Sequence, residues 1–383
     1  MRRGRTRGKT DVDETHNILG SQLIGRDRMR TLAIDIGVGT TDIMLIDSDK
    51  NPENCIKMVL PSPIRQYAGA VRKVTAAHKD LFILGDTIGG GEFSSALKKH
   101  VAAGLKVIMT EKAAYSVRND LDEVRQRGIE VVADVSPPGG FVGETIWLQE
   151  VRLNEVVGFL RDAADIGKID AVAVAVQDHG VPPKGVSNRL TRIGMMRDAM
   201  AKDPRLEILA YTPDTVPDGL LRMRCAVERA RKEMPEAKVI AMDTSPAAAL
   251  GCLTDPQVDE RGCVLAVNAG NGHMLAVLMD SGRVLGAMEA HTRAFDSKRL
   301  GEFLEGFLSS SLSNEDVFDD GGHGLFRLKE RLPKPDQIMV TGPNRGMMEG
   351  SGLRFRYATP AGDVMMTGPM GLNRAVTSLL DRI

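Results

Sequence analysis

The sequence has few cysteines and few aromatic residues, and its positive and negative charges nearly cancel. Cys55, Cys225, Cys252 and Cys263 are scattered and form no C-x-x-C pair, which excludes zinc-ribbon and iron–sulfur patterns and favours free thiols in a reducing cytoplasm. Aromatic residues make up 4% of the chain and leave little material for stacking on nucleic-acid bases. A net charge of −1 gives no electrostatic reason to expect nucleic acid or a membrane surface as a partner.

Long apolar runs are absent as well, because no stretch approaches the roughly 20 residues that a membrane-spanning helix needs. The basic, polar residues 1–29 predict a flexible tail, with a nucleic-acid-binding arm as the alternative, and not a secretory signal. This tail contains GRTRGKT, which imitates a P-loop. It has three residues where the motif needs four between the first glycine and the Gly-Lys pair, and no strand precedes it. We therefore expect a cytoplasmic protein whose phosphate site, if it has one, lies elsewhere.

One segment occurs twice in the chain. Residues 32–49 read LAIDIGVGTTDIMLIDSD, and residues 265–282 read LAVNAGNGHMLAVLMDSG. They align without a gap over 18 positions, of which seven are identical. Each copy has two β-favouring runs around a glycine-containing turn, which is typical of a β-hairpin. The repeat predicts two similar α/β halves that arose by internal duplication, and chance similarity between glycine turns is the alternative.

Between and after the hairpins, apolar runs alternate with helical patterns, which predicts parallel strands in an α/β fold. The predicted strands are 81–86, 106–110, 129–135, 169–177, 238–243 and 336–342, and the predicted helices are 93–105, 113–127, 154–164, 187–201, 245–253, 297–311, 324–331 and 368–380. We divide the chain into the tail at 1–29, an N-terminal lobe at 30–245 with an inserted β/α region at about 80–150, and a C-terminal lobe at 246–383.

The glycine turns of the two hairpins are suited to hold an anion. Gly37 and Gly39 in one turn, and Gly270 and Gly272 in the other, remove side chains so that successive backbone N–H groups can point outward. Two such loops that face each other across a cleft would grip the phosphates of one nucleotide from both sides. A carboxylate in that cleft could orient a Mg²⁺ ion through water.

Asp35, at the end of the first strand, is the candidate for this carboxylate. Thr40 and Thr41 follow the first turn and could add hydroxyl contacts to phosphate. Each of these residues could also have a purely structural role, because ordinary hairpin turns use the same residue types. The repetition of the motif favours the phosphate-binding interpretation.

Five motifs resemble those of the superfamily of actin, heat-shock chaperone ATPases and sugar kinases, and they occur in the same order. The two phosphate motifs are matched by DIGVGTTD at 35–42 and NAGNGH at 268–273, the crossing helices by MDTSPAAALGCL at 242–253 and GPMGLNRAV at 368–376, and the adenosine motif by VTGPNRGMM at 340–348. The resemblance implies two duplicated actin-like (ribonuclease H-like) lobes with Mg²⁺ and ATP in the cleft between them. It implies nucleotide contacts from Gly37, Gly39, Thr40, Thr41, Asn268, Gly270, Asn271, Gly272, Gly342, Pro343, Asn344 and Arg345.

The chain departs from this superfamily at one position. The superfamily usually has an aspartate where this chain has Asn268, and an amide supplies no negative charge to Mg²⁺. The metal would then depend on Asp35 and on Asp243, which begins the first crossing helix. This change argues against fast hydrolysis and leaves nucleotide binding intact. Arg345 would stack on adenine or close a cap, and a surface arginine is the alternative.

The whole chain is also similar to a group labelled putative pyruvate formate-lyase activating protein. The radical enzymes named by that label need the cysteine motif C-x-x-x-C-x-x-C, and this chain has none. The resemblance to the group therefore gives no support to radical chemistry.

Three further segments carry candidate substrate-binding residues. The segment QDHG, at 177–180, follows a predicted strand and resembles a Gln-x-His-Gly motif of some sugar kinases. Asp178 could act there as a general base, with Gln177 and His179 binding substrate, and a backbone-capping turn is the alternative. The loop with Gly89, Gly90 and Gly91 opens a helix and could hold an anionic group.

In the third segment, EAHT at 289–292, Glu289 and His291 lie on one side of an extended chain and could line the cleft. An ordinary hydrogen-bonded histidine is the alternative, and a lone histidine favours it. Taken together, the motifs predict Mg-ATP binding with phosphoryl transfer, either ATP hydrolysis or transfer to a small-molecule acceptor with Asp178 as base. The alternative is a nucleotide-gated activator that remodels a partner protein with slow turnover or none.

Overall fold

The computed structural model describes residues 28–133 and 135–380, so the expected basic tail lies outside the described residues except at its last two positions. Its first sheet contains the first hairpin and has the order β3-β2-β1-β8-β9. Strand β2 is antiparallel to β1, and β3, β8 and β9 run in the same direction as β1. The strands are β1 (Arg30–Ile36), β2 (Thr40–Asp47), β3 (Ile56–Pro61), β8 (Ala171–Val176) and β9 (Lys238–Met242).

The second sheet contains the second hairpin and repeats this arrangement. Its order is β13-β12-β11-β10-β14-β15, so that β10 has the central place that β1 has in the first sheet. The strands are β10 (Cys263–Ala269), β11 (His273–Asp280), β12 (Arg283–His291), β13 (Gly324–Arg327), β14 (Gln337–Thr341) and β15 (Arg356–Tyr357). Without β13 at its edge, the two sheets have the same strand order and directions.

The two hairpins have the same strand register. Their registers run from Arg30 opposite Asp47 and from Cys263 opposite Asp280, which are equivalent positions of the repeat. Both turns close with the same backbone hydrogen bond, from the Gly37 N–H to the Thr40 carbonyl at 2.9 Å and from the Gly270 N–H to the His273 carbonyl at 3.0 Å. The duplication predicted from the sequence is therefore present in the fold, and the chain consists of two actin-like α/β lobes.

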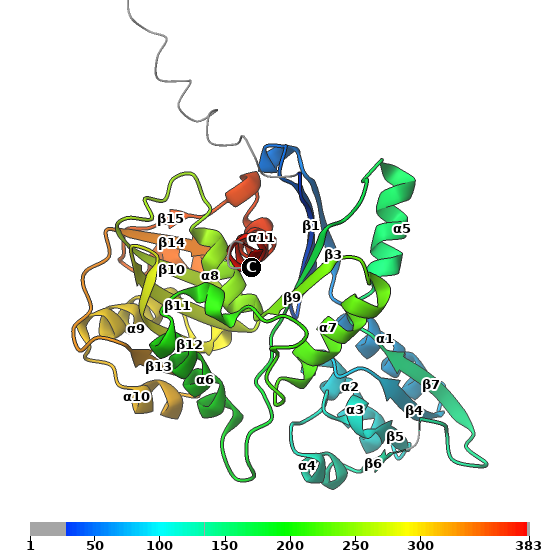
Figure 1. Cartoon of the computed structure of the whole chain (residues 1–383). Coiled ribbons are helices and arrows are strands. Elements are labelled where there is room, and N and C mark those ends of the chain that lie inside the picture. Colours follow the sequence, from blue (N-terminus) through cyan, green and yellow to red (C-terminus); the bar gives the residue numbers. More distant parts are fainter. Residues whose placement is uncertain (1–27, 134, 381–383) are drawn as a thin grey trace, which may run out of the picture.

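A separate parallel sheet with the order β6-β5-β4-β7 lies below the first sheet in Figure 1. Its strands are β4 (Asp80–Gly85), β5 (Val107–Thr110), β6 (Ile129–Val132) and β7 (Gly143–Leu148), and it carries the helices α1 (Pro63–Ala76), α2 (Gly91–Ala102), α3 (Glu111–Ala114) and α4 (Leu121–Gln126). The sequence prediction of one helix over 113–127 was wrong, because the chain stops helix α3 and restarts at Asp120. The Asp120 side chain caps α4 by accepting from the Asp122 N–H at 2.8 Å.

The predicted helix over 324–331 was also wrong. This segment forms β13, which pairs with β12 at the edge of the second sheet, because Gly324, Leu325 and Phe326 are buried there. Helices α1 and α7 (Leu221–Glu233) and strand β7 were not predicted from the sequence. None of the helices in the described parts of the chain has the length and apolar character required to cross a bilayer.

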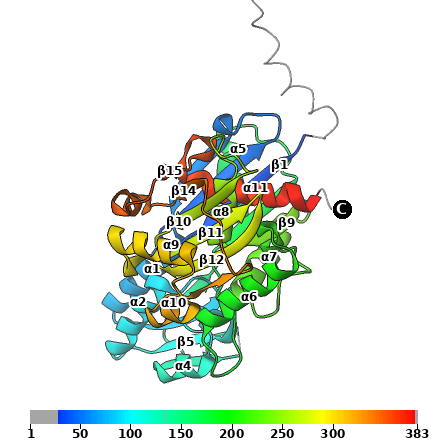
Figure 2. The ribbon, with the colours of Figure 1, turned by 90° about the vertical axis from the view of Figure 1, so that its left-hand side faces the viewer.

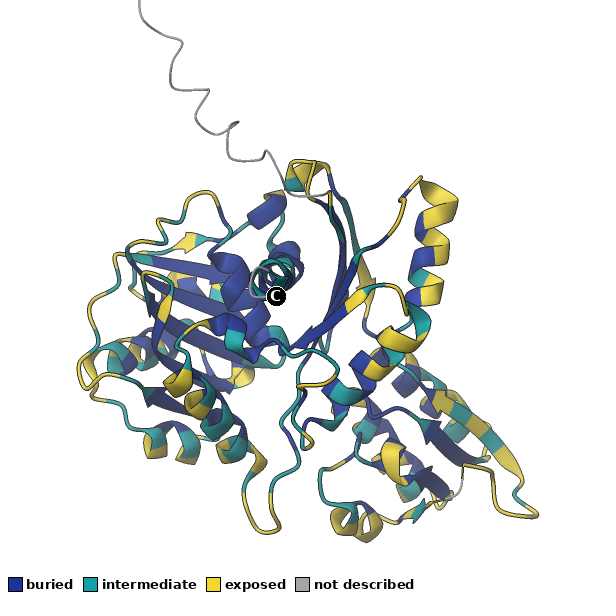
Figure 3. Ribbon diagram, viewed as in Figure 1, coloured by how far each residue is buried: buried dark blue, intermediate teal, exposed yellow. Residues whose placement is uncertain are grey.

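Two helices cross between the lobes. Helix α8 (Thr244–Cys252) follows β9 of the first sheet but packs on β10, β11 and β14 of the second. Helix α11 (Thr367–Leu380) ends the second half and packs on β1, β2 and β8 of the first. Figure 1 shows both helices between the two sheets, and Figure 3 shows that this central layer is buried. The hydrophobic core is therefore continuous across the lobes.

The outer faces of the two sheets are covered separately. Helices α5 (Leu153–Ala163) and α7 bury the outer face of the first sheet, and α9 (Ser297–Ser309) and α10 (Asn314–Asp319) cover that of the second. Helix α6 (Asn188–Lys202) belongs to the part of the sequence assigned to the N-terminal lobe, but it contacts β13 of the second sheet. Figure 2 shows α6 beside α10 and below β12, so this helix is a third connection between the lobes.

The α8–α11 crossing requires glycine at two positions. A Cβ atom at Gly251 would overlap the Thr367 carbonyl oxygen, and one at Gly371 would overlap the Ala247 carbonyl oxygen. Both obstacles are helix backbone, which cannot move as a side chain can. We expect Gly251→Ala to lower the free energy of unfolding by about 3 kcal/mol, at the upper end of the cost of overpacking a core.

Urea unfolding monitored by circular dichroism measures this change. The matched control is Gly158→Ala in α5, where an added Cβ meets nothing within 4 Å. In a helix interior this control should stabilise the protein by about 0.5–1 kcal/mol. An equal, small effect of the two substitutions would contradict the close helix crossing.

Candidate active site

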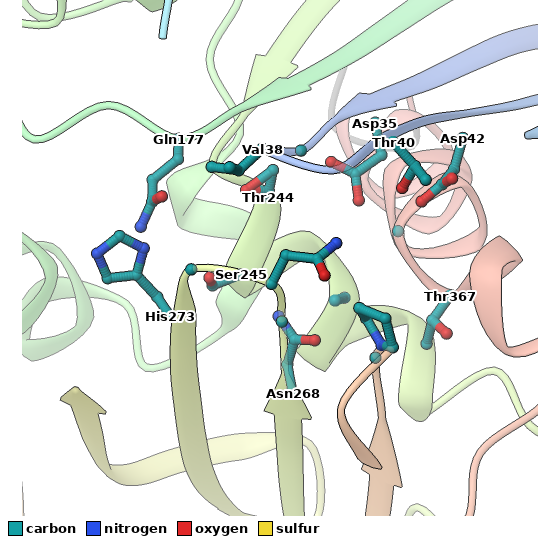
Figure 4. Close-up of a pocket in the computed structure, with 18 of the residues that line it drawn as sticks. Asp35, Val38, Thr40, Asp42, Gln177, Thr244, Ser245, Asn268, His273 and Thr367 are labelled. Atoms are coloured by element: carbon teal, nitrogen blue, oxygen red, sulfur yellow. The ribbon is translucent and has the colours of Figure 1, made fainter. Parts of the chain in front are cut away.

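A crevice between the lobes brings the two glycine turns together. We call it the interlobe crevice; its volume is about 90 Å³. Residues from both hairpins, from the adenosine motif and from α11 line it: Asp35, Gly37, Val38, Thr40, Asp42, Asn268, Gly270, Asn271, Gly272, Gly342, Pro343, Thr367 and Gly368. Figure 4 shows Asp35, Thr40 and Asp42 on one side of this crevice and Gln177 and His273 on the other.

The tips of the two turns are in direct contact. A Cβ atom at Gly39 would overlap the side-chain amide of Asn271, and one at Gly272 would lie 3.7 Å from a methyl group of Val38. Glycine at position 39 thus allows the turn of one lobe to meet the turn of the other. The sequence alone did not predict a contact this close.

Two carboxylates of the first hairpin line the crevice. Asp35 and Asp42 are opposite each other in the β1–β2 register, and one carboxylate oxygen of each is buried without a hydrogen-bond partner. Burial and then the neighbouring Asp42 raise the pKa of Asp35 well above its usual range. Burial raises the pKa of Asp42 to about 7. Two neighbouring carboxylates, one half-buried and one buried, are suited to hold a divalent cation.

The corresponding positions of the second hairpin carry no charge. Asn268 stands where the first hairpin has Asp35, and it is opposite Leu275. The acidic side of the crevice is therefore the first lobe. Thr40 lines the crevice as predicted, whereas Thr41 is buried and does not line it.

The segment 340–348, predicted as the adenosine motif, supplies a glycine beside the crevice and a side chain that holds the second glycine turn. Gly342 has φ +93°, and a Cβ atom there would lie 2.8 Å from the Asn268 side-chain oxygen, so this turn needs glycine next to the crevice. Asn344 does not line the crevice; its side chain donates to the Gly270 carbonyl at 2.9 Å and holds the second glycine turn. The Arg345 guanidinium lies 5.5 Å from the Tyr357 ring centre, which is a structural contact.

Asp178 has the geometry of a backbone cap. Its carboxylate accepts from the Gly180 N–H at 2.9 Å and from the Met223 N–H at 3.0 Å, near the start of α7. Burial raises the pKa of Asp178 despite these hydrogen bonds. The capping alternative thus accounts for every contact of this carboxylate, and the general-base role stays a prediction. The neighbouring Gln177 side-chain nitrogen is buried and has no hydrogen-bond partner.

Asp243 is engaged in a buried ion pair. The Arg192 guanidinium donates to both oxygens of Asp243, at 2.6 and 2.8 Å, and also to both oxygens of Glu289, at 2.6 and 2.8 Å. Asp243 in addition caps α8 by accepting from the Ser245 N–H at 3.2 Å. A metal ion could use Asp243 only if this network opened, which argues against the predicted metal role. Glu289, predicted to line the cleft, instead lies fully buried in the network.

A second cavity adjoins the interlobe crevice. We call it the GGG cavity because Gly89, Gly90 and Gly91 line it; its volume is about 290 Å³. It shares Val38, Gln177, Arg222 and His273 with the interlobe crevice. The Gly89 N–H is not free for an anion, since it donates to Glu150 at 2.8 Å. The Arg222 guanidinium, paired with Glu150 at 2.7 Å, is the buried cation between the two cavities.

Four histidines gather where the lobes meet. His179 follows β8, His273 begins β11, His291 ends β12 opposite His273, and His323 precedes β13. Burial lowers the pKa of all four, to about 4 for His273, so that they are neutral at pH 7. His179 lines the GGG cavity as predicted, whereas His291 is exposed and lines neither cavity.

The described part of the chain, 28–133 and 135–380, has one group of at least three His, Cys, Asp or Glu side chains placed to hold a metal, and it consists of His179, His273 and His323. The cysteines are buried and free.

One protein-family model matches the chain. The family model described as "Putative pyruvate format-lyase activating enzyme (DUF1786)" matches residues 88–347, which is more than half of the chain. The chain belongs to this family. No curated protein matches it.

Solved structures with distant similarity include three examples. A Bacteroides thetaiotaomicron protein described as having an actin-like ATPase fold and unknown function is 8% identical, with 89% of this chain and 95% of that chain covered and a TM-score of 0.36. A Streptomyces griseus ROK family glucokinase, in complex with glucose and AMPPNP, is 9% identical, with 91% and 98% covered and a TM-score of 0.34. An exopolyphosphatase-like protein is 10% identical, with 82% of this chain covered, only 66% of that chain spanned and a TM-score of 0.29. The strand order of the two sheets supports actin-like lobes independently of these similarities.

Proposed function

We propose that the chain binds Mg-ATP between its lobes and catalyses phosphoryl transfer, either to water or to a small-molecule acceptor. The observation that carries this proposal is the meeting of two equivalent glycine turns, one from each lobe, over a single crevice. Their backbone N–H groups can bind phosphate oxygens from two sides.

The residues of the first hairpin fit the metal that such a nucleotide needs. Asp35 and Asp42 would hold Mg²⁺, since both line the crevice and each has a buried oxygen without a hydrogen-bond partner. When bound, Mg²⁺ neutralises charge on the phosphates. Arg222, at the end of the crevice toward the GGG cavity, provides a positive charge between nucleotide and acceptor.

Nucleotide binding requires the lobes to separate. The crevice volume of about 90 Å³ is well below the roughly 300–1,000 Å³ of typical ligand pockets. We expect the lobes to part by movement along the α8–α11 crossing, whose small residues permit sliding of packed helices. The GGG cavity, which is larger and shares four lining residues with the crevice, is the site we propose for the acceptor.

The alternative function is a nucleotide-gated activator of a partner protein with slow turnover or none. Two observations favour it: Asn268 is uncharged where the superfamily has an acid, and both Asp178 oxygens are already used by backbone N–H groups. The lobe movement caused by ATP would then be the output.

Asp178→Asn separates the two functions. If Asp178 is the general base, we expect ATP turnover with the correct acceptor to fall by about 10²–10⁴-fold while ATP affinity is unchanged. The measurement is turnover against a panel of small-molecule acceptors, with affinity from titration calorimetry. A capping role would lower thermal stability and leave turnover per folded molecule intact, and tight ATP binding without stimulation by any acceptor would favour the activator.

A further inference from the structure

The histidine cluster at the lobe boundary is arranged like a metal-binding site. One nitrogen from each of His179, His273 and His323 lies within 4.8 Å of the others. The closest pair, the Nε2 atoms of His179 and His323, are 3.2 Å apart. Zinc–nitrogen bonds of about 2.0–2.1 Å in a tetrahedron place ligand atoms about 3.4 Å apart, so small side-chain rotations complete the geometry.

The hydrogen bonding of the cluster leaves ring nitrogens without partners. Neither ring nitrogen of His273 has a hydrogen-bond partner, and neither does Nδ1 of His323, although these atoms are buried. His323 is fully buried, and its backbone N–H donates to the Glu289 carbonyl at 2.9 Å, which fixes its position. Buried imidazole nitrogens without partners are costly in a protein, and a bound cation would satisfy one nitrogen of His273.

An acidic group lies against the cluster. Arg192 supplies one positive charge to the two carboxylates of Asp243 and Glu289, so this buried network carries one net negative charge when both acids are ionised. The Glu289 carboxylate lies 3.4 Å from Nδ1 of His323. A carboxylate behind a histidine is the common second-shell arrangement at zinc, where it orients the ring and raises its basicity.

We propose that His179, His273 and His323 bind one Zn²⁺ ion at the boundary between the lobes. Imidazole ligands suit zinc and neighbouring transition metals and do not suit Mg²⁺. Three protein ligands leave the fourth position for water or a substrate oxygen, as in catalytic zinc sites. His179 and His273 also line the GGG cavity, so a group bound there can reach the ion.

Such an ion would link the two lobes. His179 belongs to the loop after β8 of the first lobe, while His273 and His323 belong to the second. Zinc can then bind all three ligands only when the lobes are closed, and it stabilises that arrangement. His273 is also the residue that follows the second glycine turn, so the zinc site and the interlobe crevice share a side chain.

Zinc titration of the full-length chain, without a histidine tag and without nucleotide, tests the proposal. We expect one Zn²⁺ per chain by titration calorimetry, with a rise in melting temperature and no competition from Mg²⁺. His179→Ala should weaken binding by more than about 100-fold, because loss of a second-shell partner alone costs about 10–100-fold. Since His179 is half-buried in a loop, its variant should fold.

The matched control is His78→Asn, which removes an exposed histidine far from the cluster and keeps a residue that tolerates φ +50°. Its zinc affinity should equal that of the natural chain. Co²⁺ gives a second readout, as a tetrahedral ligand-field spectrum that His179→Ala abolishes. Absence of stoichiometric zinc binding, or equal affinity in His179→Ala, would overturn the proposal. Both measurements are made without nucleotide, so their failure is distinguishable from a failure of Mg-ATP binding, which is tested at Asp35 and the glycine turns.

Discussion

Replacing Asp35 with asparagine is expected to weaken Mg²⁺-dependent ATP binding by about 10–100-fold, the usual cost of losing a carboxylate that holds a metal through its outer shell. The substitution keeps the shape of the side chain and removes its charge. Asp35 lies beside Gly368 of α11, where a Cβ atom would overlap the carboxylate, so a larger side chain would test packing instead. The measurement is ATP affinity by titration calorimetry with Mg²⁺ and with EDTA.

Although Asp35→Asn should weaken ATP binding, it should raise the stability of the folded protein at neutral pH. Burial raises the pKa of Asp35 and Asp42, the latter to about 7, so ionisation of these acids costs free energy in the folded state. Their contribution to stability is therefore highest below about pH 4, the unfolded pKa, and falls as pH rises toward 7. Asp35→Asn should make this decrease smaller, which urea unfolding at pH 5 and pH 8 measures.

Asp49→Asn is the control for both experiments, because Asp49 is an exposed acid just after β2, away from the crevice. It should leave Mg-ATP affinity unchanged. If Asp35→Asn retained the full Mg²⁺ effect on ATP affinity, Asp35 would not be the residue that holds the metal, and Asp42 would be the next candidate.

Arg192→Leu is expected to destabilise the protein by about 3–5 kcal/mol. Arg192 is 4% exposed, and its loss would leave Asp243 and Glu289 buried and unpaired; breaking a buried ion pair from one side typically costs this much. Burial opposes ionisation of Glu289, but the Arg192 guanidinium more than offsets it and lowers the pKa of that carboxyl. This contribution to stability should be present at neutral pH and be lost as pH falls through the folded pKa of Glu289.

Arg197→Ala is the matched control on the same helix, α6. The Arg197 side chain is 57% exposed and pairs with Asp198 at 2.9 Å, so its loss should cost at most about 1 kcal/mol. Combining Arg192→Leu with Asp243→Asn and Glu289→Gln should recover part of the lost stability, since no unpaired charge then remains buried. Equal effects of Arg192→Leu and Arg197→Ala in urea unfolding would contradict the buried network.

The sequence predicted the features that are local or repeated. The hairpin at 32–49 and its copy at 265–282 carry the same spacing of glycines, and this was enough to predict two related lobes. The crossing helices were predicted from their resemblance to the crossing-helix motifs of the superfamily. Asp42 was missed as a crevice residue although the hairpin register, which follows from the turn at Gly37–Thr40, puts it opposite Asp35.

Residues that act through tertiary contacts gave no sequence signal. Arg192 and Arg222 lie in helices with many other charged residues, and only the packing of α6 and α7 shows that both are buried between acids. His323 stands just before β13, at the edge of a segment that was predicted to be helical, so its meeting with His179 across the lobes could not be predicted. The segment 324–331 was misread because edge pairing with β12 overrides its helical composition.

The most direct test of the central claim is a crystal structure with Mg²⁺ and a non-hydrolysable ATP analogue. We predict that phosphate oxygens of one nucleotide accept from backbone N–H groups of both glycine turns, 37–40 and 270–273, with the metal beside Asp35. A nucleotide held by one turn alone, or bound away from the interlobe crevice, would contradict the account.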